Sequence, residues 1–455
     1  MTAPIEALLS ELAIDTPASA IPESARAAAA VQVFDTLGVS LAAAAHPAGR
    51  IAVGVLDQLG GSPQARVLGT GTRTSVVQAA WANGTLAHLL DFDDVGFSHP
   101  TATILPGALA VAEHLDVRGR TLLDAMVVGY EVFERLAASG REDDPRLRER
   151  GYHPTPIYGA IAATAAAARL LGLDAGQLAM AFGLAATDAS GLTQQFGTWG
   201  KGLHAGNAAR TGVFCALLAK GGYWGDPLGL SGPRGLFSAL HGEGRYDLSG
   251  VGDGLGDRWA INDPGLALKV YPACGSSRRG LDALLKLTAD PAYDVDQVER
   301  IVLDVHPHVF NQLQYRAPVE GFRGKFSLDY VIAAAALDGD VTIESFLDER
   351  AGRPAFRAML AKVELREHPE WDISHWRDQP VEVQLRDGTV LRAAVDSPRG
   401  TRKNPLSRDE IVAKFIGCAE RALGGPRAAD AVDTVWDLDH APSIQAVVDA
   451  LVTQP

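Results

Sequence analysis

The feature that most constrains the fold is an alanine-rich stretch, PIYGAIAATAAAARLLGLDAGQLAMAFGLAA, which begins at Pro156. Proline suits the first turn of a helix, Gly172 suits its end, and Asp174 can cap a second helix. Alanine is the best helix former and is small enough to let helix axes approach closely. The stretch therefore predicts two helices inside a densely packed helical domain.

Most of the first 240 residues share this composition, being rich in Ala, Leu and Gly with few β-branched runs. Helices are predicted at residues 25–45, 76–94, 104–115, 120–139, 156–172, 176–190 and 205–221. Beyond Pro405, a capping box from Ser407 to Glu410 predicts a further helix, and a last one is expected near 443–452. We expect these C-terminal helices to rejoin the N-terminal helical domain.

The segment between these helical parts has a different pattern. Residues 300–305 alternate apolar and polar positions as a half-buried strand does, and residues 380–396 give two such runs joined at Asp387-Gly388, a hairpin signal. Helical patterns at 276–289, 326–337 and 343–348 and a possible strand at 362–366 complete it. We predict a mainly α protein in which a smaller α+β lid domain, 268–401, is inserted into a large all-helical domain made of residues 1–267 and 402–455. A cleft between the two is the default ligand site.

Charge and cysteine content exclude several classes of function. The 455 residues carry a net charge of −14, and no segment supplies the basic footprint that nucleic-acid phosphates require. The three cysteines lie far apart without CxxC spacing, which indicates neither a disulfide framework nor a zinc knuckle. The N-terminal segment does not resemble a secretory signal, and no window of about 18 uninterrupted apolar residues is present. We expect a cytoplasmic protein without nucleic-acid or membrane partners.

A first group of candidate site residues lies in DFDDVGFSHP, residues 91–100. If the helix that begins near residue 76 continues through it, His88, Asp91 and Asp94 share one face and Asp93 points elsewhere. Asp91 would then orient a cationic group across the cleft, whereas the alternative is a set of solvated carboxylates at a helix end. His99 follows in a loop before a proline, where a single His is more often structural than catalytic.

A second group combines two segments. In RERGYHPTPIYGA, His153 lies just before the alanine-rich helix, where amide groups favour a neutral imidazole suited to a general base. In FGTWGKGLHAGNAARTG, Lys201 lies in a Gly-rich turn, and His204 and Asn207 follow at a spacing of three on one helical face. Packing alone does not require these residue types at the start of an Ala-rich helix, so we interpret them as functional.

A third group lies at the boundary between helical domain and lid, in LALKVYPACGSSRRGLDALL. It contains Lys269, Tyr271, Cys274, Ser276, Ser277 and Arg278. The Ser pair precedes an amphipathic helix whose N-terminus could hold an anion, whereas the alternative is a capped helix with surface arginines, which applies above all to Arg279. Tyr330, in KFSLDYVIAAAAL with Lys325 and Ser327, is a further candidate, and core packing is its alternative role.

These groups offer cations, proton carriers and carboxylates without a phosphate loop or a nucleotide fingerprint, because VLGTGT and GDGLGD match neither GxGxxG nor a Walker A pattern. Lysine, arginine and histidine would hold bound carboxylates, and a positioned base would remove a proton next to one of them. This predicts elimination or epimerisation chemistry on a small acid, with no cofactor and no metal.

The same segments resemble the signature segments of the MmgE/PrpD family: DFDD followed by HP, GYHPTPIYGAIAATAAAARLLGL, GTWGKGLHAGNAARTG, KVYPAC and FSLDY. The family includes 2-methylcitrate dehydratase, cis-aconitate decarboxylase and iminodisuccinate epimerase. The resemblance implies a homodimer, an all-helical domain with an α+β lid, and cofactor-independent chemistry on small di- or tricarboxylates. It places Asp91, His99, His153, Lys201, Lys269 and Tyr330 at active-site positions, with His204 and Asn207 in one of the same motifs.

The chain departs from the family pattern at a few positions. Cys274 stands where cis-aconitate decarboxylase has a His, and Val95 stands where its Asp-rich motif continues with Thr. Many members have a Thr-His pair where this chain has Ser277 and Arg278. Losing an imidazole removes a proton carrier, whereas a guanidinium adds a fixed carboxylate clamp. Decarboxylation of cis-aconitate is therefore the least favoured of the three activities.

Our hypothesis is a lyase or isomerase, 2-methylcitrate dehydratase-like, in which His99 or His153 is the acid or base. Lys201, Lys269 and Arg278 would bind carboxylates, Tyr330 would donate a hydrogen bond or proton, and Asp91 would orient a cation. The substrate-binding set is completed by His204, Asn207, Tyr271, Cys274 and Ser277. Two other readings remain open: a Mg²⁺-dependent all-helical enzyme that uses the Asp91–Asp94 cluster, and a non-enzymatic helical scaffold, in which His153 and Lys201 would lie far apart.

Overall fold

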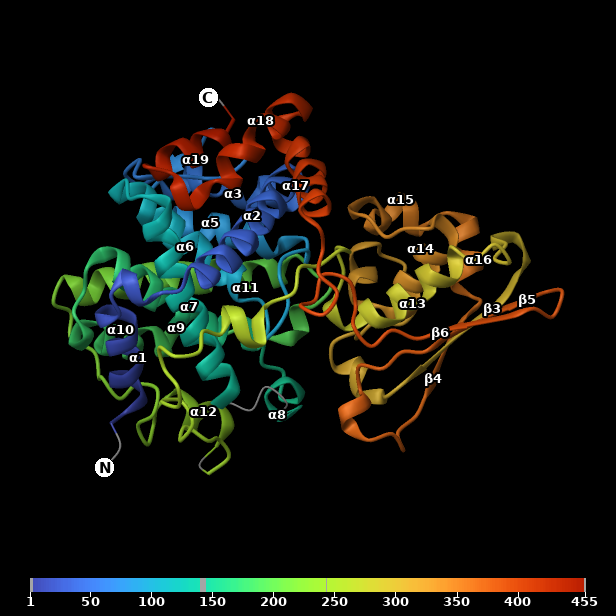
Figure 1. The fold of residues 1–455 in the computed structure, drawn as a ribbon, viewed down its shortest axis with the longest axis horizontal. Helices are drawn as coiled ribbons and strands as arrows, with labels where there is room; N and C mark the ends of the chain where they lie inside the picture. The colour runs from blue at the N-terminus through green and yellow to red at the C-terminus, as the bar shows by residue number, and fades with distance from the viewer. Residues whose placement is uncertain (1–2, 140–144, 243, 454–455) are drawn as a thin grey trace.

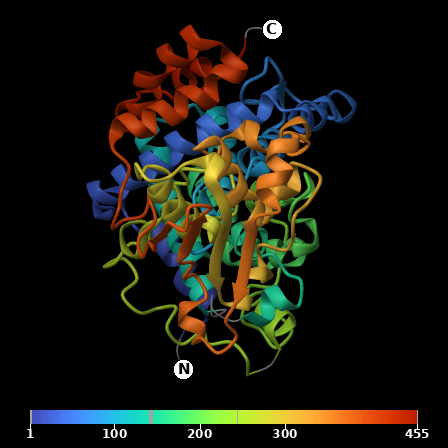
Figure 2. The ribbon, with the colours of Figure 1, turned by 90° about the vertical axis from the view of Figure 1, so that its right-hand side faces the viewer.

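The computed structural model describes residues 3–139, 145–242 and 244–453 and is mainly α, as predicted. Figure 1 shows a large helical body that contains both chain ends and, beside it, a smaller lid that carries the main sheet. Figure 2 shows the C-terminal helices lying against the N-terminal ones, in agreement with the packing of α17 on α2.

The helical body is built from both ends of the chain. Its helices are α1 (Ile5–Asp15), α2 (Glu23–Ala45), α3 (Pro47–Gly54), α4 (Leu56–Leu59), α5 (Val76–Leu89), α6 (Pro100–Leu115), α7 (Gly119–Ser139), α8 (Pro145–Glu149), α9 (Pro154–Leu171), α10 (Ala175–Asp188), α11 (Gly200–Lys220), α12 (Leu236–His241), α17 (Arg408–Leu423), α18 (Gly425–Trp436) and α19 (Ile444–Ala450). A short antiparallel pair, β1 (Ala65–Arg66) and β2 (Arg73–Thr74), precedes α5.

The alanine-rich stretch forms α9 and α10, with the end signals that the sequence predicted. Gly172 closes α9 in the left-handed conformation at φ 70°, and Asp174 caps α10 in a capping box with Gln177. Helix α2 is long and apolar enough to cross a membrane by composition alone, but 78% of its most apolar window is buried inside the protein, as in a core helix.

Small residues bring α5 and α11 unusually close together, which positions the site. A Cβ at Gly206 would lie 2.2 Å from Thr85 Oγ1 and 2.5 Å from the Trp81 carbonyl oxygen. A Cβ at Gly202 would lie 2.9 Å from Leu89 Cα. Because larger side chains would separate these helices, the glycines let the start of α11 touch the end of α5.

The lid is a four-stranded sheet with helices packed on it. Strands β3 (Val298–Val305), β4 (Val363–Glu367), β5 (Val381–Leu385) and β6 (Val390–Ala393) are arranged in the order β4-β3-β5-β6. Strand β3 is parallel to β4 and antiparallel to β5, and β5 and β6 form the predicted hairpin. The lid helices are α13 (Arg278–Thr288), α14 (Leu328–Asp338), α15 (Asp348–Ala351) and α16 (Pro354–Leu360). Helix α13 packs on β5 and β6, and α14 packs on β4.

Each part has a hydrophobic core of its own. The larger core joins residues between Ile5 and Leu268 to residues between Ile411 and Leu451, and the lid core extends from Tyr271 to Leu385 with Phe196 of the helical body added. The chain crosses between them beside the loop that follows α5, where Val95 and Ala267 form an isolated antiparallel bridge. This crossing places the segment that contains Lys269 and Cys274 against the loop that contains Asp91 and His99.

Candidate active site

The loop after α5 differs from the sequence-based prediction, because the helix ends at Leu89 and not near residue 94. Asp91 has a left-handed backbone, with φ 52°, so the chain leaves the helical path at that residue. The prediction that Asp91 and Asp94 share a helical face is therefore wrong. Asp94 instead accepts a hydrogen bond from Thr101 Oγ1 at 2.9 Å.

Asp91 binds two buried lysines. Its Oδ1 lies 2.8 Å from Lys201 Nζ and 2.9 Å from Lys269 Nζ, and Lys269 also donates to the Asp91 carbonyl oxygen at 2.8 Å. Burial alone would raise the pKa of this carboxyl group, but the two ammonium groups hold the pKa below its ordinary range. Asp91 is therefore ionised and holds two cations at the base of the site.

Asp93 links two imidazoles, contrary to the prediction that it points away from the site. Its Oδ1 lies 3.0 Å from His88 Nδ1 and its Oδ2 lies 3.1 Å from His99 Nδ1. These contacts hold the pKa of Asp93 well below its ordinary value although burial opposes this. The carboxylate was missed because a helical period was extended through residues that are not helical.

His88 and His99 are both neutral and have defined tautomers. Burial, together with Lys201 in each case, lowers the pKa of His88 to about 4 and lowers that of His99. Nδ1–H of His99 donates toward Asp93 and toward the Asp94 carbonyl oxygen at 2.7 Å, which leaves the lone pair on Nε2. His88 receives a hydrogen bond on Nε2 from Lys201 Nζ at 2.6 Å.

His153 and His204 form a second imidazole pair beside the first. Their Nδ1 atoms lie 3.0 Å apart, and the His153 ring centroid is 6.0 Å from that of His88. Burial lowers the pKa of His204 to about 4 and holds that of His153 well below its ordinary value. His153 is therefore close to Lys201, the partner of His88, which contradicts the scaffold reading.

Lys325 is a buried lysine that the sequence analysis named without placing it in the site. It lies in a short 3-10 helix, Phe322–Phe326, and Nζ donates to the carbonyl oxygens of Leu90 at 3.0 Å and Pro272 at 2.7 Å. Burial lowers its pKa to about 7. Since Leu90 precedes Asp91 and Pro272 belongs to the lid, Lys325 ties the Asp91 loop to the lid.

A cleft of about 340 Å³ opens beside His99, between the helical body and the lid. Six of the described lining residues carry a cationic side chain and one, Asp396, carries a carboxylate. The cationic residues are Arg148, Arg278, Arg279, Arg377, Arg402 and Lys403. Cys274 and Ser276 also line this cleft, and burial raises the pKa of the Cys274 thiol. The cleft is suited to a small anion.

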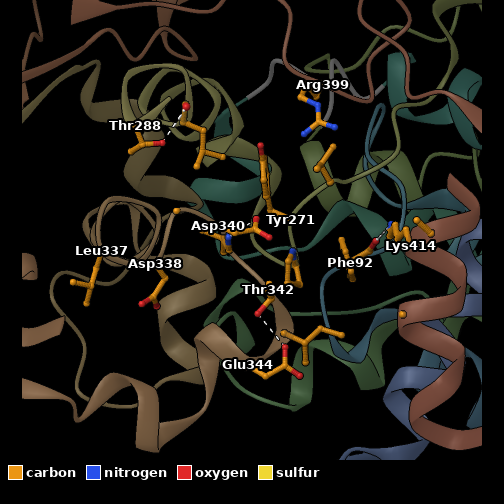
Figure 3. A pocket seen from close by; sticks show the side chains of 18 of the residues that line it. Phe92, Tyr271, Thr288, Leu337, Asp338, Asp340, Thr342, Glu344, Arg399 and Lys414 are labelled. Carbon is orange, nitrogen blue, oxygen red and sulfur yellow. Dashed lines mark hydrogen bonds between the residues drawn. The ribbon is translucent and has the colours of Figure 1, made fainter. Parts of the chain in front are cut away.

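A larger cavity of about 1080 Å³ lies elsewhere between the two parts of the chain and is shown in Figure 3. Lys414 and Phe92 lie on one side of it and Leu337 and Asp338 on the other, with Tyr271 and Arg399 between them (Figure 3). No histidine lines it among the described residues. We therefore place the candidate site in the smaller cleft.

Several predicted site residues point away from the cleft. Tyr330 is fully buried in the lid core, where its hydroxyl donates to the Ser345 carbonyl oxygen at 2.7 Å. The Tyr271 hydroxyl donates to Asp282 at 2.8 Å, and Tyr271 lines the larger cavity. Ser277 Oγ donates to the Cys274 carbonyl oxygen at 2.8 Å. The structure thus does not bring these three hydroxyl groups to His99.

The remaining predicted residues lie on α11 and at the start of α13. Asn207 is half-buried, one turn beyond His204, and it does not line the cleft. Arg278 is the first residue of α13 and lines the cleft beside Cys274. The members that converge are thus Asp91, His99, Lys201 and Lys269, with His153 and His204 behind them.

The cluster also bears on the magnesium hypothesis. Four side chains of the cluster could together hold a metal ion, because one ligand atom from each lies within 4.8 Å of the others. They belong to His88, Asp91, Asp93 and His99. A divalent cation there would face Lys201 and Lys269, which already contact Asp91 Oδ1. Asp94, the remaining carboxylate of the hypothesis, is engaged by Thr101, and burial raises its pKa. The residues present therefore fit anion binding better than Mg²⁺.

Comparison with known proteins identifies the family of the chain. The family model described as the MmgE/PrpD N-terminal domain matches residues 7–249, and that of the MmgE/PrpD C-terminal domain matches residues 271–438. Cis-aconitate decarboxylase of Homo sapiens is 30% identical over 378 residues, which cover 79% of this chain and 76% of that protein. Cis-aconitate decarboxylase of Aspergillus terreus (strain NIH 2624 / FGSC A1156) is 28% identical, with coverage of 85% and 83%. 2-Methylcitrate dehydratase of Escherichia coli (strain K12) is 24% identical, with coverage of 84% and 83%. The chain belongs to the MmgE/PrpD family.

Proposed function

We propose that the protein is a cofactor-independent lyase or isomerase that removes a proton from the carbon next to a carboxylate of a small di- or tricarboxylate. The observation that carries this proposal is the position of His99. It is a neutral imidazole whose Nδ1 is held by Asp93, and it lines a cleft rich in cationic side chains. A base beside an anion site is what such chemistry requires.

His99 is the proposed base, and its Nε2 accepts the substrate proton. Asp93 stabilises the imidazolium that forms, because its carboxylate lies against Nδ1. His153 is less suited to this role, because it does not line the cleft and its Nδ1 faces His204. We therefore propose that His153 and His204 pack behind the cluster of His88, Asp91, Asp93 and His99 and do not transfer the proton.

Lys201 and Lys269 are proposed to stabilise the enolate-like charge that develops when the proton leaves. Their ammonium groups meet at Asp91 Oδ1, which lies 3.9 Å from His99 Nε2, so positive charge is concentrated next to the base. One well-placed donor of this kind contributes about 3 kcal/mol to transition-state stabilisation.

The fate of the carbanion decides the reaction. Loss of a hydroxyl group from the neighbouring carbon gives a dehydratase, which is our first choice, and return of a proton to the opposite face gives an epimerase. Decarboxylation is a further candidate, and the observation in its favour is the 30% identity to the human cis-aconitate decarboxylase against 24% to the bacterial dehydratase. The departures from the family pattern oppose it, since Val95 and Cys274 differ from the decarboxylase pattern and Arg278 differs from that of many family members.

The direct test is NMR of candidate acids incubated with the enzyme in deuterated buffer. Citrate, 2-methylcitrate, aconitate and iminodisuccinate form a suitable panel. Deuterium entering a carbon next to a carboxylate supports the proposal even when turnover is reversible, and loss of CO₂ from aconitate identifies the decarboxylase. If no acid exchanges a proton, or if Lys201→Ala leaves exchange unchanged, the proposal is wrong.

We further propose a cytoplasmic homodimer. The dimer is supported by apolar side chains exposed along α11, namely Trp199 at its N-cap with 48% exposure, Leu203 in its first turn and Phe214 in its second half with 50% exposure. The three cysteines are unpaired and buried, which is compatible with a reducing compartment. Sedimentation velocity of the wild type and of Phe214→Glu tests the dimer: the variant should sediment as a monomer, and an unchanged dimer would exclude this face.

A further inference from the structure

Arg278 differs from the other described cations of the cleft in having a buried guanidinium nitrogen without an acceptor. Its Nε donates to the Gly275 carbonyl oxygen at 3.1 Å, which fixes the side chain against the turn before α13. Its Nη1 is buried and has no hydrogen-bond partner within the part of the chain that the structure describes. A buried N–H group without an acceptor is costly, and the cost falls when a ligand supplies one.

Two neighbouring arginines already have carboxylate partners. Arg279 pairs with Asp378, and Arg402 lies 3.2 Å from Asp263. No carboxylate among the described residues pairs with Arg278, and burial, with a contribution from Arg377, lowers its pKa to about 10. An arginine with that pKa is still charged at neutral pH. Arg278 is therefore a cation that a bound anion would neutralise.

Arg278 lies on the lid side of the cleft, whereas His99 lies on the helical side. Lys201 and Lys269, the lysines proposed to neutralise the reacting carboxylate, both contact Asp91. The site therefore has two separate groups of positive charge, the buried lysines at Asp91 beside His99 and Arg278 in the lining of the cleft.

We propose that Arg278 is a specificity-determining anchor for a carboxylate other than the one next to the reacting carbon, so that the enzyme prefers tricarboxylates to dicarboxylates. This inference rests on the proposed function, since it assumes that the cleft holds the substrate. Arg278 binds and orients and does not transfer the proton, because a guanidinium remains charged at neutral pH.

The test compares two inert acids that share one carbon skeleton and differ by a single carboxylate, tricarballylate and glutarate. Isothermal titration calorimetry of the wild type should give a dissociation constant at least tenfold lower for tricarballylate. In Arg278→Gln the preference should fall to about one, and Arg278→Lys should restore part of it because the charge returns without the fork. Arg353→Gln is the matched control and should keep the wild-type preference, since Arg353 pairs with Asp338 away from the cleft.

Thermal unfolding of each variant shows whether it is folded before binding is compared. A wild type without preference for tricarballylate would overturn the inference, and so would an Arg278→Gln variant that keeps the preference. The binding result is independent of turnover. A preference that depends on Arg278, together with no deuterium exchange on any acid, would leave the anchor standing and refute the proposed function. Deuterium exchange without a preference for tricarballylate would support the proposed function and refute the role of Arg278 as an anchor.

Discussion

At the scale of single residues, Asp91 is the counter-ion on which the site depends. One of its carboxylate oxygens contacts two buried ammonium groups, those of Lys201 and Lys269. Removing one member of a buried ionic group leaves uncompensated charge, which costs more than the group contributes as a whole. Asp91 also has a left-handed backbone, a conformation that aspartate tolerates better than most residues.

Asp91→Asn should therefore destabilise the protein by about 3 kcal/mol and abolish proton exchange. Urea unfolding monitored by circular dichroism measures the first effect, and the deuterium assay measures the second. Asp430→Asn, at an exposed position on α18, is the control and should change neither. An Asp91→Asn variant as stable as the wild type would show that the lysines are not both charged.

The pH dependence of kcat/KM follows from the state of His99. Because the base must be neutral and its pKa lies below the ordinary 6.5, kcat/KM should fall only as the pH drops below 6.5. In Asp93→Asn the carboxylate that favours the imidazolium is gone, so the acid limb should move to lower pH while kcat decreases. An acid limb that moves to higher pH in this variant would exclude Asp93 as the partner of His99.

At the scale of elements, the crossing of α5 and α11 depends on glycine. Gly206→Ala would bring a methyl group to 2.5 Å from the Trp81 carbonyl oxygen, so the helices must separate and Lys201 must withdraw from His88. We expect a loss of about 1–3 kcal/mol in unfolding free energy and a lower kcat.

Gly417→Ala is the matched helical control, because the added Cβ on α17 meets nothing within 4 Å. It should stabilise the protein by about 0.5–1 kcal/mol and leave kcat unchanged, since alanine is the better helix former. Equal effects of the two substitutions would show that the close crossing does not matter.

Most secondary-structure elements could be predicted from the sequence. Most helices, the lid hairpin and strand β3 followed from periodicity and end signals, and α9 and α10 followed almost residue by residue. Helices α1, α3, α4, α8, α12, α15, α16 and α18 were not predicted, and α5 was extended too far. The missed helices α16 and α18 have a proline in their first turn and lie in short segments between stronger patterns, where periodicity gives little signal.

The site was predicted less completely, for a related reason. A motif places a residue on an element but does not tell where its side chain points, so Tyr330 looked functional although it packs in the lid core. Asp93 was left out because a helical period was extended past the end of α5. Lys325 was left out because its role arises where chain segments far apart in sequence meet. His88 was also left out of the predicted site, although it could have been included. It lies in the last turn of α5, directly before the Asp91 loop.

At the scale of the whole molecule, burial of neutral histidines couples stability to pH. The pKa of His88 and of His204 is about 4 in the folded protein and near 6.5 when the chain unfolds. The unfolded chain therefore binds more protons between these values, so stability is complete above pH 6.5 and is lost as the pH falls toward 4.

Thermal melting from pH 8 to pH 4 should therefore show a steady Tm from pH 8 to 7 and a steep fall below 6.5. Each pKa unit corresponds to about 1.4 kcal/mol for one group. His204→Gln should reduce the steepness of the fall, whereas His375→Gln, at an exposed position, should not. A Tm independent of pH in this range would mean that these imidazoles are not buried in the neutral form.

The central claim is that His99 takes the substrate proton inside a cationic cleft. The most direct measurement is the rate at which deuterium enters the best substrate of the panel, compared between the wild type and His99→Gln. A general base contributes about 10²- to 10⁴-fold, so we predict a loss of that size in His99→Gln with the fold and the binding of tricarballylate retained. Exchange at the wild-type rate in folded His99→Gln would contradict the account.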